Sequence, residues 1–456
     1  MIPFGQQESG GDPEHTGTGG GRLSEDGTRF YLTDPRGVYV YDTTQPTSPE
    51  LLGSLTLFQT QTGAALAQED PDTNGEILLV DGSNNPATGS RLTVVDVSDP
   101  ENGLSILSTL PVTDHTWTCV SGPADEDGEI NTCQFAYGRT GHIIDLTDPT
   151  APVNLPRTWR QAVGHGTRTN APYTHDLTEI RPGLVMSAGS TAILMDTSDP
   201  AQPVELTHIT QQGRFSSLGY HSTEWADGGR APHLVLGTEI APAPIAALAP
   251  AGENLAGSDC DGGNSVIETW DARAVIAALD AMDDGVPANI AFDGVEFTPL
   301  DTFDAAGRGI YLQGQAPGHV LYCAHWMDLH RGYGEDGGLM AVSYYDRGTR
   351  FVETAANGEM REIGWITALE SYSGSARWIS DDVVYIMDYR RGLEVVQIDL
   401  GREAAGTFDS AGTLVALTSN FTPAPRMHAE SMAFPALMLL LAGAWALERR
   451  RTASSR

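Results

Sequence analysis

The sequence predicts an all-β fold: a seven-bladed β-propeller of four-stranded blades, with two insertions and a C-terminal transmembrane helix. Two observations support this prediction. The 456 residues include 51 Gly and 27 Pro, and so many turn-forming residues argue against a helical bundle or a coiled coil. In addition, one sequence phrase recurs along the chain at intervals of roughly 50 residues, a period typical of stacked supersecondary units.

Each copy of the phrase consists of a β-rich run, an acidic marker, a few turn residues and a second apolar run, as in RLTVVDVSDP at 91–100. The markers are Asp42, Asp96, Asp145, Asp196, Asp271, Glu353 and Asp399. A β-branched run favours a strand and a following Asp favours an Asx turn, so each phrase predicts a hairpin. Another strand pair precedes each copy, which gives four strands per unit. Such units predict a propeller; a pair of β-sandwiches or a solenoid is the alternative.

Three of the phrases resemble a known repeat. VVDVSDP (94–100), IIDLTDP (143–149) and ILMDTSDP (193–200) are similar to the LVIVD repeat, which occurs in bacterial and archaeal surface proteins. The segment from YCAHWMDLH to VVQID resembles the C-terminal blades of exported members. The resemblance covers residues 30–400, although the fifth and sixth units lack the Asp-Pro turn. It implies a propeller fold and an envelope location, without an agreed activity.

The domain boundaries follow from composition. Residues 1–28 are Gly-rich and acidic, and we expect an arm that leads into the first strand of blade one. The propeller is predicted over 29–400. Its insertions fall at 240–264 and 275–318, and the second begins with helical spacing, which predicts a short helix on the propeller rim. Residues 401–431 have the composition of a linker.

The C-terminal region contains an uncharged apolar run at residues 432–447, followed by a basic tail at 448–456. A helix of this length spans about 24 Å, somewhat less than the ~30 Å hydrocarbon layer of a bilayer. We expect a transmembrane anchor or a sorting tail, with the arginines on the cytoplasmic side. A terminal helix packed on the domain is the alternative.

The four cysteines bear on the compartment. Cys119 and Cys133 flank a predicted hairpin loop, which favours a disulfide, and Cys260 and Cys323 would then form a second one. Four free thiols in a reducing cytosol are the alternative. Disulfides and an anchor predict a protein that is extracytoplasmic, at the cell surface or in the envelope. The first residues show no signal peptide, and a start codon assigned too far downstream would account for that.

The charge balance excludes one class of partner. The formal net charge is -34 at pH 7, and all 26 basic residues are Arg because the sequence contains no Lys. Such a charge repels nucleic acid and the anionic face of a membrane. We therefore expect a protein, a glycan or a small ligand at one mouth of the propeller, and membrane contact only through the C-terminal helix.

Four histidines are the main candidate site. His115, His175, His221 and His325 each open the first strand of a predicted blade, and His15 is the corresponding candidate in blade one. First strands line the channel of a propeller, so these imidazoles would converge there and suit zinc, copper or iron. Propeller oxidases related to selenium-binding proteins carry histidine-ligated metal in that region, a similarity of architecture only. The alternative is structural, with each histidine hydrogen-bonded to a neighbouring blade.

A second candidate is a calcium loop in DPDTNGEILLVD, residues 70–81. Asp70, Asp72, Asn74 and Asp81 occupy loop positions that supply oxygen ligands in calcium-binding loops, and a glycine permits the turn between them. The departures are a strand-like run within the segment and an Asp in place of the final bidentate Glu. A solvated acidic turn is the alternative.

No motif predicts catalysis, since the sequence contains neither a GxSxG elbow nor an HExxH helix. We therefore expect a non-catalytic envelope propeller that acts as a binding scaffold, in which a channel metal would be structural. The alternative is an extracytoplasmic metal-dependent oxidase or hydrolase that uses the histidine ring.

Overall fold

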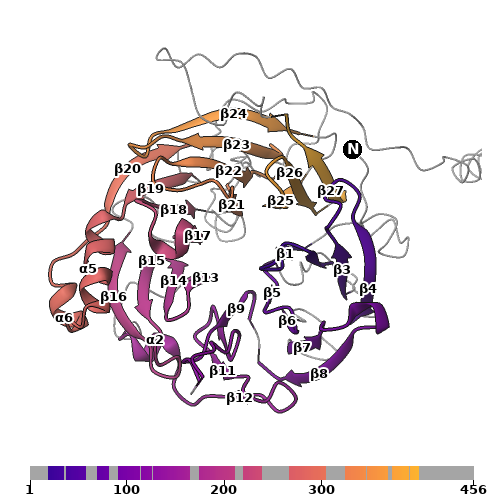
Figure 1. The fold of residues 1–456 in the computed structure, drawn as a ribbon, viewed down its shortest axis with the longest axis horizontal. Coiled ribbons are helices and arrows are strands. Elements are labelled where there is room, and N and C mark those ends of the chain that lie inside the picture. Colours follow the sequence, from indigo (N-terminus) through magenta and orange to yellow (C-terminus); the bar gives the residue numbers. More distant parts are fainter. Residues whose placement is uncertain are drawn as a thin grey trace, which may run out of the picture.

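The computed structural model describes residues 19–34, 37–57, 69–81, 91–112, 114–125, 127–164, 174–210, 219–238, 266–304, 324–345, 347–367, 372–389 and 391–399. These residues form seven antiparallel sheets arranged as blades around a central axis (Figure 1). The predicted seven-bladed propeller is confirmed. Six blades have four strands, and the seventh has three within the described residues.

The strands of the first four blades follow chain order. Blade 1 contains β1 (Gly21–Leu23), β2 (Arg29–Thr33), β3 (Gly37–Asp42) and β4 (Glu50–Thr56). Blade 2 contains β5 (Asp72–Thr73), β6 (Ile77–Asp81), β7 (Leu92–Asp96) and β8 (Ser105–Leu110). Blade 3 contains β9 (Trp117–Val120), β10 (Phe135–Gly138), β11 (Ile143–Asp145) and β12 (Val153–Asn154). Blade 4 contains β13 (Thr174–Arg181), β14 (Leu184–Gly189), β15 (Thr191–Asp196) and β16 (Val204–Thr210).

The last three blades continue the pattern. Blade 5 contains β17 (Tyr220–Glu224), β18 (His233–Thr238), β19 (Ile267–Asp271) and β20 (Thr298–Phe303). Blade 6 contains β21 (Met327–Leu329), β22 (Gly338–Ser343), β23 (Thr349–Thr354) and β24 (Met360–Ile366). Blade 7 contains β25 (Ser373–Trp378), β26 (Val383–Asp388) and β27 (Gly392–Gln397). The first strand of each blade lies innermost, around the channel (Figure 1).

The acidic markers end the third strand of a blade, as the repeat predicted. Asp42, Asp96, Asp145, Asp196 and Asp271 are the final residues of β3, β7, β11, β15 and β19. Each carboxylate accepts a hydrogen bond from the amide two residues ahead, at 2.7–3.0 Å. These are Asx turns, which start the connection to the fourth strand. In the last two copies the marker is displaced slightly: Glu353 is the penultimate residue of β23, and Asp399 lies two residues after β27.

The hydrophobic core lies between neighbouring blades. Middle strands such as β7 are buried on both faces, because each sheet packs against a blade on either side, and their sequences are nearly continuous apolar runs. Blade 7 packs against blade 1 through Phe30 and Tyr385, whose ring centroids are 5.1 Å apart in an edge-to-face pair. Burying one such side chain contributes ~1.5–3 kcal/mol, so this contact helps to close the ring.

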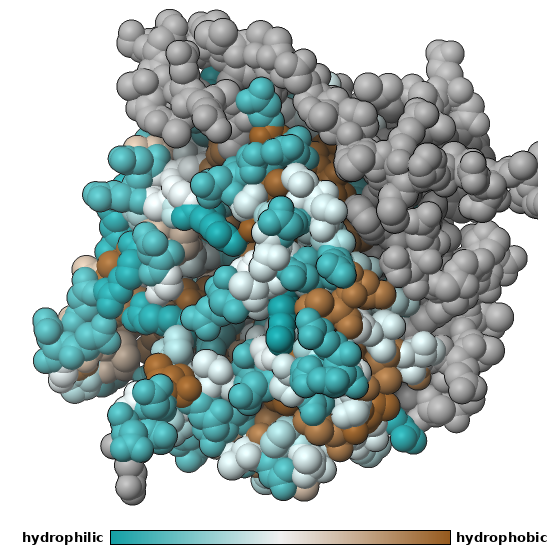
Figure 2. All heavy atoms as spheres, turned by 45° about the vertical axis from the view of Figure 1, so that its right-hand side comes forward, coloured by the Kyte–Doolittle hydropathy of each residue, from teal (hydrophilic) through white to brown (hydrophobic). Residues whose placement is uncertain are grey.

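The predicted rim helix is present. α5 (Arg273–Asp283) and α6 (Ala288–Ala291) interrupt blade 5 between β19 and β20 and lie outside β16 (Figure 1). Val275, Ala278 and Leu279 of α5 are buried in the core shared by blades 4 and 5. The other helices within the described residues are single turns: η1 (Pro100–Asn102), α2 (Trp159–Ala162) and α3 (Ala226–Gly229). Hydrophilic residues dominate the face in Figure 2, interspersed with smaller hydrophobic patches.

Two sequence predictions about covalent and membrane features have different outcomes. Cys119 and Cys133 form a disulfide, as predicted. Cys260 and Cys323 lie outside the described residues, as does the apolar run at 432–447. In the part of the chain that the structure describes, no helix is long and apolar enough to span a bilayer.

Candidate metal centre

The four predicted histidines converge in the channel at the start of four consecutive first strands. His175 and His221 are the residues skipped by register shifts, between Thr174 and Asp176 in β13 and between Tyr220 and Ser222 in β17. A bulged residue leaves the regular alternation of a strand, which lets its side chain point toward the channel. His115 and His325 lie two residues before the first residues of β9 and β21.

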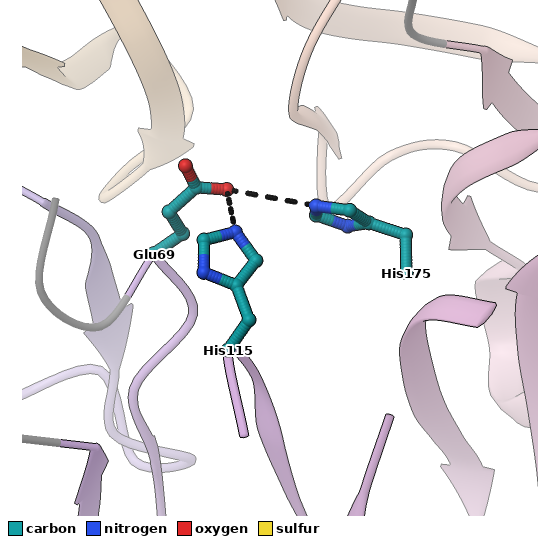
Figure 3. A group of neighbouring side chains, drawn as sticks. All are labelled: Glu69, His115 and His175. Carbon is teal, nitrogen blue, oxygen red and sulfur yellow. Dashed lines mark ion pairs between the residues drawn. The ribbon is translucent and has the colours of Figure 1, made fainter. Parts of the chain in front are cut away.

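A carboxylate from blade 2 completes the group. Glu69 Oε2 lies 3.0 Å from His115 Nε2, 3.5 Å from His325 Nε2, and 3.9 Å from the Nε2 atoms of both His175 and His221. Figure 3 shows Glu69, His115 and His175 pointing toward one another from different blades. Two sets of donors are close enough to share one ion, Glu69 with His115 and His175, and Glu69 with His221 and His325.

The group is buried, with one more accessible side. The side chains of His221 and His325 are 1% exposed, whereas that of His115 is 21% exposed. Neighbouring imidazoles also contact each other, with ring centroids 3.6 Å apart for His175 and His221 and 4.4 Å for His221 and His325. Trp326 packs edge-on against His221 at 4.9 Å. Protein side chains therefore surround the centre, and access is greatest beside His115.

Electrostatics prepare these groups as ligands. Burial and the charge of His115 hold the pKa of His175 well below its usual value. Burial and the charges of His175 and His325 lower the pKa of His221 in the same way. For Glu69, burial opposes ionisation, but the charges of His115 and His325 outweigh it and the pKa of Glu69 lies well below its usual range. Neutral imidazole and ionised carboxylate are the forms that bind metal ions.

Contacts around the ligands fix their orientation. His325 Nδ1 lies 2.5 Å from the carbonyl oxygen of Gly374, which is itself the skipped residue of a bulge in β25. Ser222 Oγ donates to the carbonyl oxygen of His325 at 3.3 Å, and Thr116 Oγ donates to that of His175 at 2.9 Å. The contact with Gly374 orients the imidazole of His325 through Nδ1, and the two hydroxyls hold the backbone of His325 and His175 in place. The predicted hydrogen bond from an imidazole to a neighbouring blade is thus present for His325, whose ring contacts blade 7, and it leaves Nε2 available for a metal ion.

The donor set fits a transition metal. Four imidazole nitrogens and one carboxylate oxygen, held by different blades, suit zinc, copper or iron and are too nitrogen-rich for calcium or magnesium. Tetrahedral zinc takes four ligands, and each of the two donor sets supplies three of them.

The four residues of the predicted calcium loop have separate partners. Asp70 pairs with Arg377 at 3.1 Å, and Asp72 pairs with Arg22 at 3.3 Å. Asn74 Oδ1 accepts hydrogen bonds from the amides of Glu76 and Ile77, and Asp81 Oδ2 accepts one from the amide of Asp114. The segment forms the hairpin of β5 and β6. Calcium binding at 70–81 stays a prediction, and this arrangement gives it no support.

Sequence reasoning missed Glu69 because it adjoins the segment interpreted as a calcium loop. The spacing of acidic residues could have identified it. Glu69 lies three positions before Asp72, just as His221 lies three positions before Glu224 and His325 three positions before Asp328. His15 lies outside the described residues. In blade 1 the equivalent position is occupied by Gly19, which donates to the carbonyl oxygen of Thr33 as His325 donates to that of Ser343.

Comparisons with known proteins support the fold alone. No protein-family model matches the sequence, and no curated protein matches it. The structure is similar to the β-propeller domain of Cps50 (Swd1) from Myceliophteria thermophila, with a TM-score of 0.50 and 10% identity, over 84% of this chain and 96% of that one.

Two further solved structures give similar values. The WD40 repeats of RRP9 match with a TM-score of 0.48 and 10% identity, over 84% of this chain and 94% of that one. A functionally unknown protein from Desulfotomaculum acetoxidans matches with a TM-score of 0.47 and 10% identity, over 81% of this chain and 88% of that one.

Proposed function

We propose that this chain is a metal-binding β-propeller whose channel holds one transition-metal ion. One observation carries the proposal: the Nε2 atoms of His115, His175, His221 and His325 all lie within 3.9 Å of one carboxylate oxygen of Glu69. A carboxylate oxygen has two lone pairs, whereas a metal ion accepts a lone pair from each of several ligands at once. A cation at this point matches the convergence better than a set of hydrogen bonds does.

We further propose that the propeller is an extracytoplasmic binding scaffold of the LVIVD type. The disulfide between Cys119 and Cys133 supports an oxidising compartment, since such bonds persist outside the cytosol. The resemblance of three repeats to LVIVD sequences and the propeller fold support a scaffold that presents a protein-binding or ligand-binding mouth. In this role the metal would tie blades 2 to 6 together across the channel.

Metal content tests the central proposal. Protein freed of metal with a chelator is dialysed against zinc, copper(II) or iron(II), and bound metal is measured by elemental analysis. We expect stoichiometric uptake of at least one of these ions by the wild type and loss of uptake in the His175→Ala/His221→Ala variant. Failure of the wild type to retain any of the three ions would overturn the proposal.

A second candidate function is metal-dependent oxidation or hydrolysis. It is favoured by the uneven exposure of the centre, because the 21% exposed His115 leaves one side through which a small molecule can approach. Oxygen consumption and ester hydrolysis by the metal-loaded wild type, compared with the His175→Ala/His221→Ala variant, test this candidate. Equal background rates in the two proteins would count against it for those reactions.

A further inference from the structure

A second set of ionisable residues lies deeper along the same first strands, three positions after the level of the metal ligands. This charged layer consists of Arg22, Asp72, Glu224, Asp328 and Arg377. Arg22 pairs with Asp72, and Arg377 lies among carboxylates from several blades. None of these residues belongs to the metal centre described above, and the blade repeat alone does not require an arginine in the channel.

Arg377 is the hub of the charged layer. Its Nη2 lies 3.1 Å from Asp70 Oδ1, and its Nη1 lies 3.4 Å from Asp328 Oδ1 and 3.5 Å from Glu224 Oε1. Its Nε donates to the carbonyl oxygen of Gly21 at 3.1 Å. One guanidinium from blade 7 therefore contacts blades 1, 5 and 6 and also Asp70, which lies two residues before β5 of blade 2. The side chain is only 7% exposed, so these contacts form away from bulk water, where they are strongest.

The contact with Asp70 links this hub to the metal centre. Asp70 follows Glu69 directly, so a guanidinium that fixes the Asp70 carboxylate also restrains the peptide that carries Glu69. Blade 1 restrains the same peptide from another side: a Cβ on Gly20 would lie 1.9 Å from the carbonyl oxygen of Glu69. Glu69 is thereby held between blade 1 and the guanidinium, although it lies before the first residue of β5.

We propose that Arg377 is a positioning residue, which sets the carboxylate of Glu69 among the four imidazoles by way of Asp70. The inference rests on the proposed metal-binding function. It assigns to a residue of blade 7 a role in a centre whose ligands come from blades 3 to 6 and from the residue before blade 2.

Electrostatics alone predict the opposite effect of removing Arg377. A guanidinium repels a metal cation nearby, so loss of its charge would tighten metal binding if repulsion were its only influence. Loss of positioning weakens binding instead, because Glu69 is then free to leave the ligand set. Removal of an outer-shell partner typically lowers metal affinity by about 10–100-fold. The sign of the change therefore separates the two roles.

The experiment compares Arg377→Met and Arg377→Lys with Arg350→Met. Arg350 is a matched control because it is fully buried and paired with Glu362 at 3.6 Å, but it lies in the third strand of blade 6, outside the channel. Copper(II) or zinc affinity is measured by competition with a chelator, and the copper(II) ligand set by electron paramagnetic resonance. Lysine keeps the charge and provides a second folded variant if the methionine variant does not fold.

We expect Arg377→Met to lower metal affinity by about 10–100-fold and to change the copper spectrum. Arg377→Lys should give a smaller loss, since an ammonium can hold Asp70 but lacks the fork that also reaches Glu224 and Asp328. Arg350→Met should lower thermal stability and leave the spectrum unchanged. Tighter binding in Arg377→Met, or an unchanged affinity and spectrum, would overturn the positioning role.

A measurement on metal-free protein separates this inference from the proposed function. The histidine Cε1 resonances of selectively labelled protein report on the surroundings of His115, which is 3.0 Å from Glu69. We expect Arg377→Met to shift the His115 resonance and Arg350→Met to leave it in place. If the wild type binds no metal but this shift occurs, the metal proposal fails and the positioning of Glu69 stands. An unmoved His115 resonance would remove the positioning role even if the metal binds.

Discussion

The metal centre and the charged layer are built on the same first strands and differ in how their charges are balanced. In the charged layer Arg22 and Arg377 face Asp72, Glu224 and Asp328, so the protein supplies its own cations. At the metal centre four imidazoles face the single carboxylate of Glu69, and His175 and His221 have pKa values well below the usual range. In the charged layer the carboxylates are thus paired with arginines of the protein, whereas at the metal centre the imidazoles gather around one carboxylate, as the proposed metal site requires.

The largest expected effect comes from removing ligands of the metal centre while leaving the charged layer intact. His175→Ala/His221→Ala removes two buried ligands, and we expect metal affinity to fall by more than about 100-fold, beyond the loss typical of an outer-shell partner. Chelator competition measures this change. The control His208→Ala alters a half-exposed histidine paired with Glu205 in β16 and should bind metal like the wild type. Equal affinities in all three proteins would show that the ion binds elsewhere.

The next largest effect concerns the disulfide in blade 3, which lies beside the charged layer. The disulfide in blade 3 joins Cys119 of β9 to Cys133, two residues before β10, across a separation of 14 positions. The amide of Cys119 also donates to Asp72 of the charged layer. Removing a cross-link over a loop of this size lowers the free energy of unfolding by about 3 kcal/mol. Denaturant unfolding of Cys119→Ala/Cys133→Ala against the wild type measures it.

A control separates this bond from the other two cysteines. Reductant should destabilise the wild type by more than it destabilises the double variant, because any effect that persists in the variant must come from elsewhere in the chain. Equal stability of the oxidised wild type and the variant would contradict a stabilising role for this disulfide.

A smaller effect moves Glu69 without removing it. In Gly20→Ala the added methyl group would lie 1.9 Å from the carbonyl oxygen of Glu69. Because this distance is too short, the backbone before β5 must shift. We expect metal affinity to fall by about tenfold, comparable to the loss of an outer-shell contact. Gly334→Ala is the control, because its Cβ would be 3.6 Å from the nearest atom, an ordinary contact. An unchanged affinity in Gly20→Ala would indicate that the position of Glu69 matters little for binding.

The smallest effect concerns the pH dependence of the charged layer. Burial and the charge of Asp328 raise the pKa of Glu224 to about 8, against the pull of Arg377. The folded protein then holds a proton that the unfolded chain releases near pH 4.5. This contribution to stability is present below that pH and is lost progressively as the pH rises toward 8.

Unfolding free energies at pH 5.5 and pH 8 measure this change. Glu224→Gln should reduce the loss of stability between the two pH values, because glutamine has no proton to release. Glu76→Gln, at an exposed position in the β5–β6 turn, should leave the loss unchanged. A steeper pH dependence in Glu224→Gln would contradict the raised pKa.

Most of the fold could be predicted from the sequence because each repeat is specified by interactions between residues that are close in the chain. An Asp after a β-branched run accepts a hydrogen bond from the amide two residues ahead, and this turn needs no contact with the rest of the chain. Asp42, Asp96 and Asp145 each accept such a hydrogen bond. The four histidines were found for a related reason, since they share one position relative to the strands. The prediction that they face the channel needed only the general geometry of a propeller.

The remaining features arise from closure of the ring. Asp70 and Arg377 are 307 positions apart, and no local pattern indicates that they meet. Glu69 likewise joins His325 only because blades 2 and 6 face each other across a channel of side-chain width. The repeated blades and the set of four histidines could be predicted from the sequence, through hydrogen bonds and propensities that act over a few residues. The meeting of Glu69 with the imidazoles and of Asp70 with Arg377 depends on the tertiary structure, because closure of the ring determines which distant side chains share the buried channel.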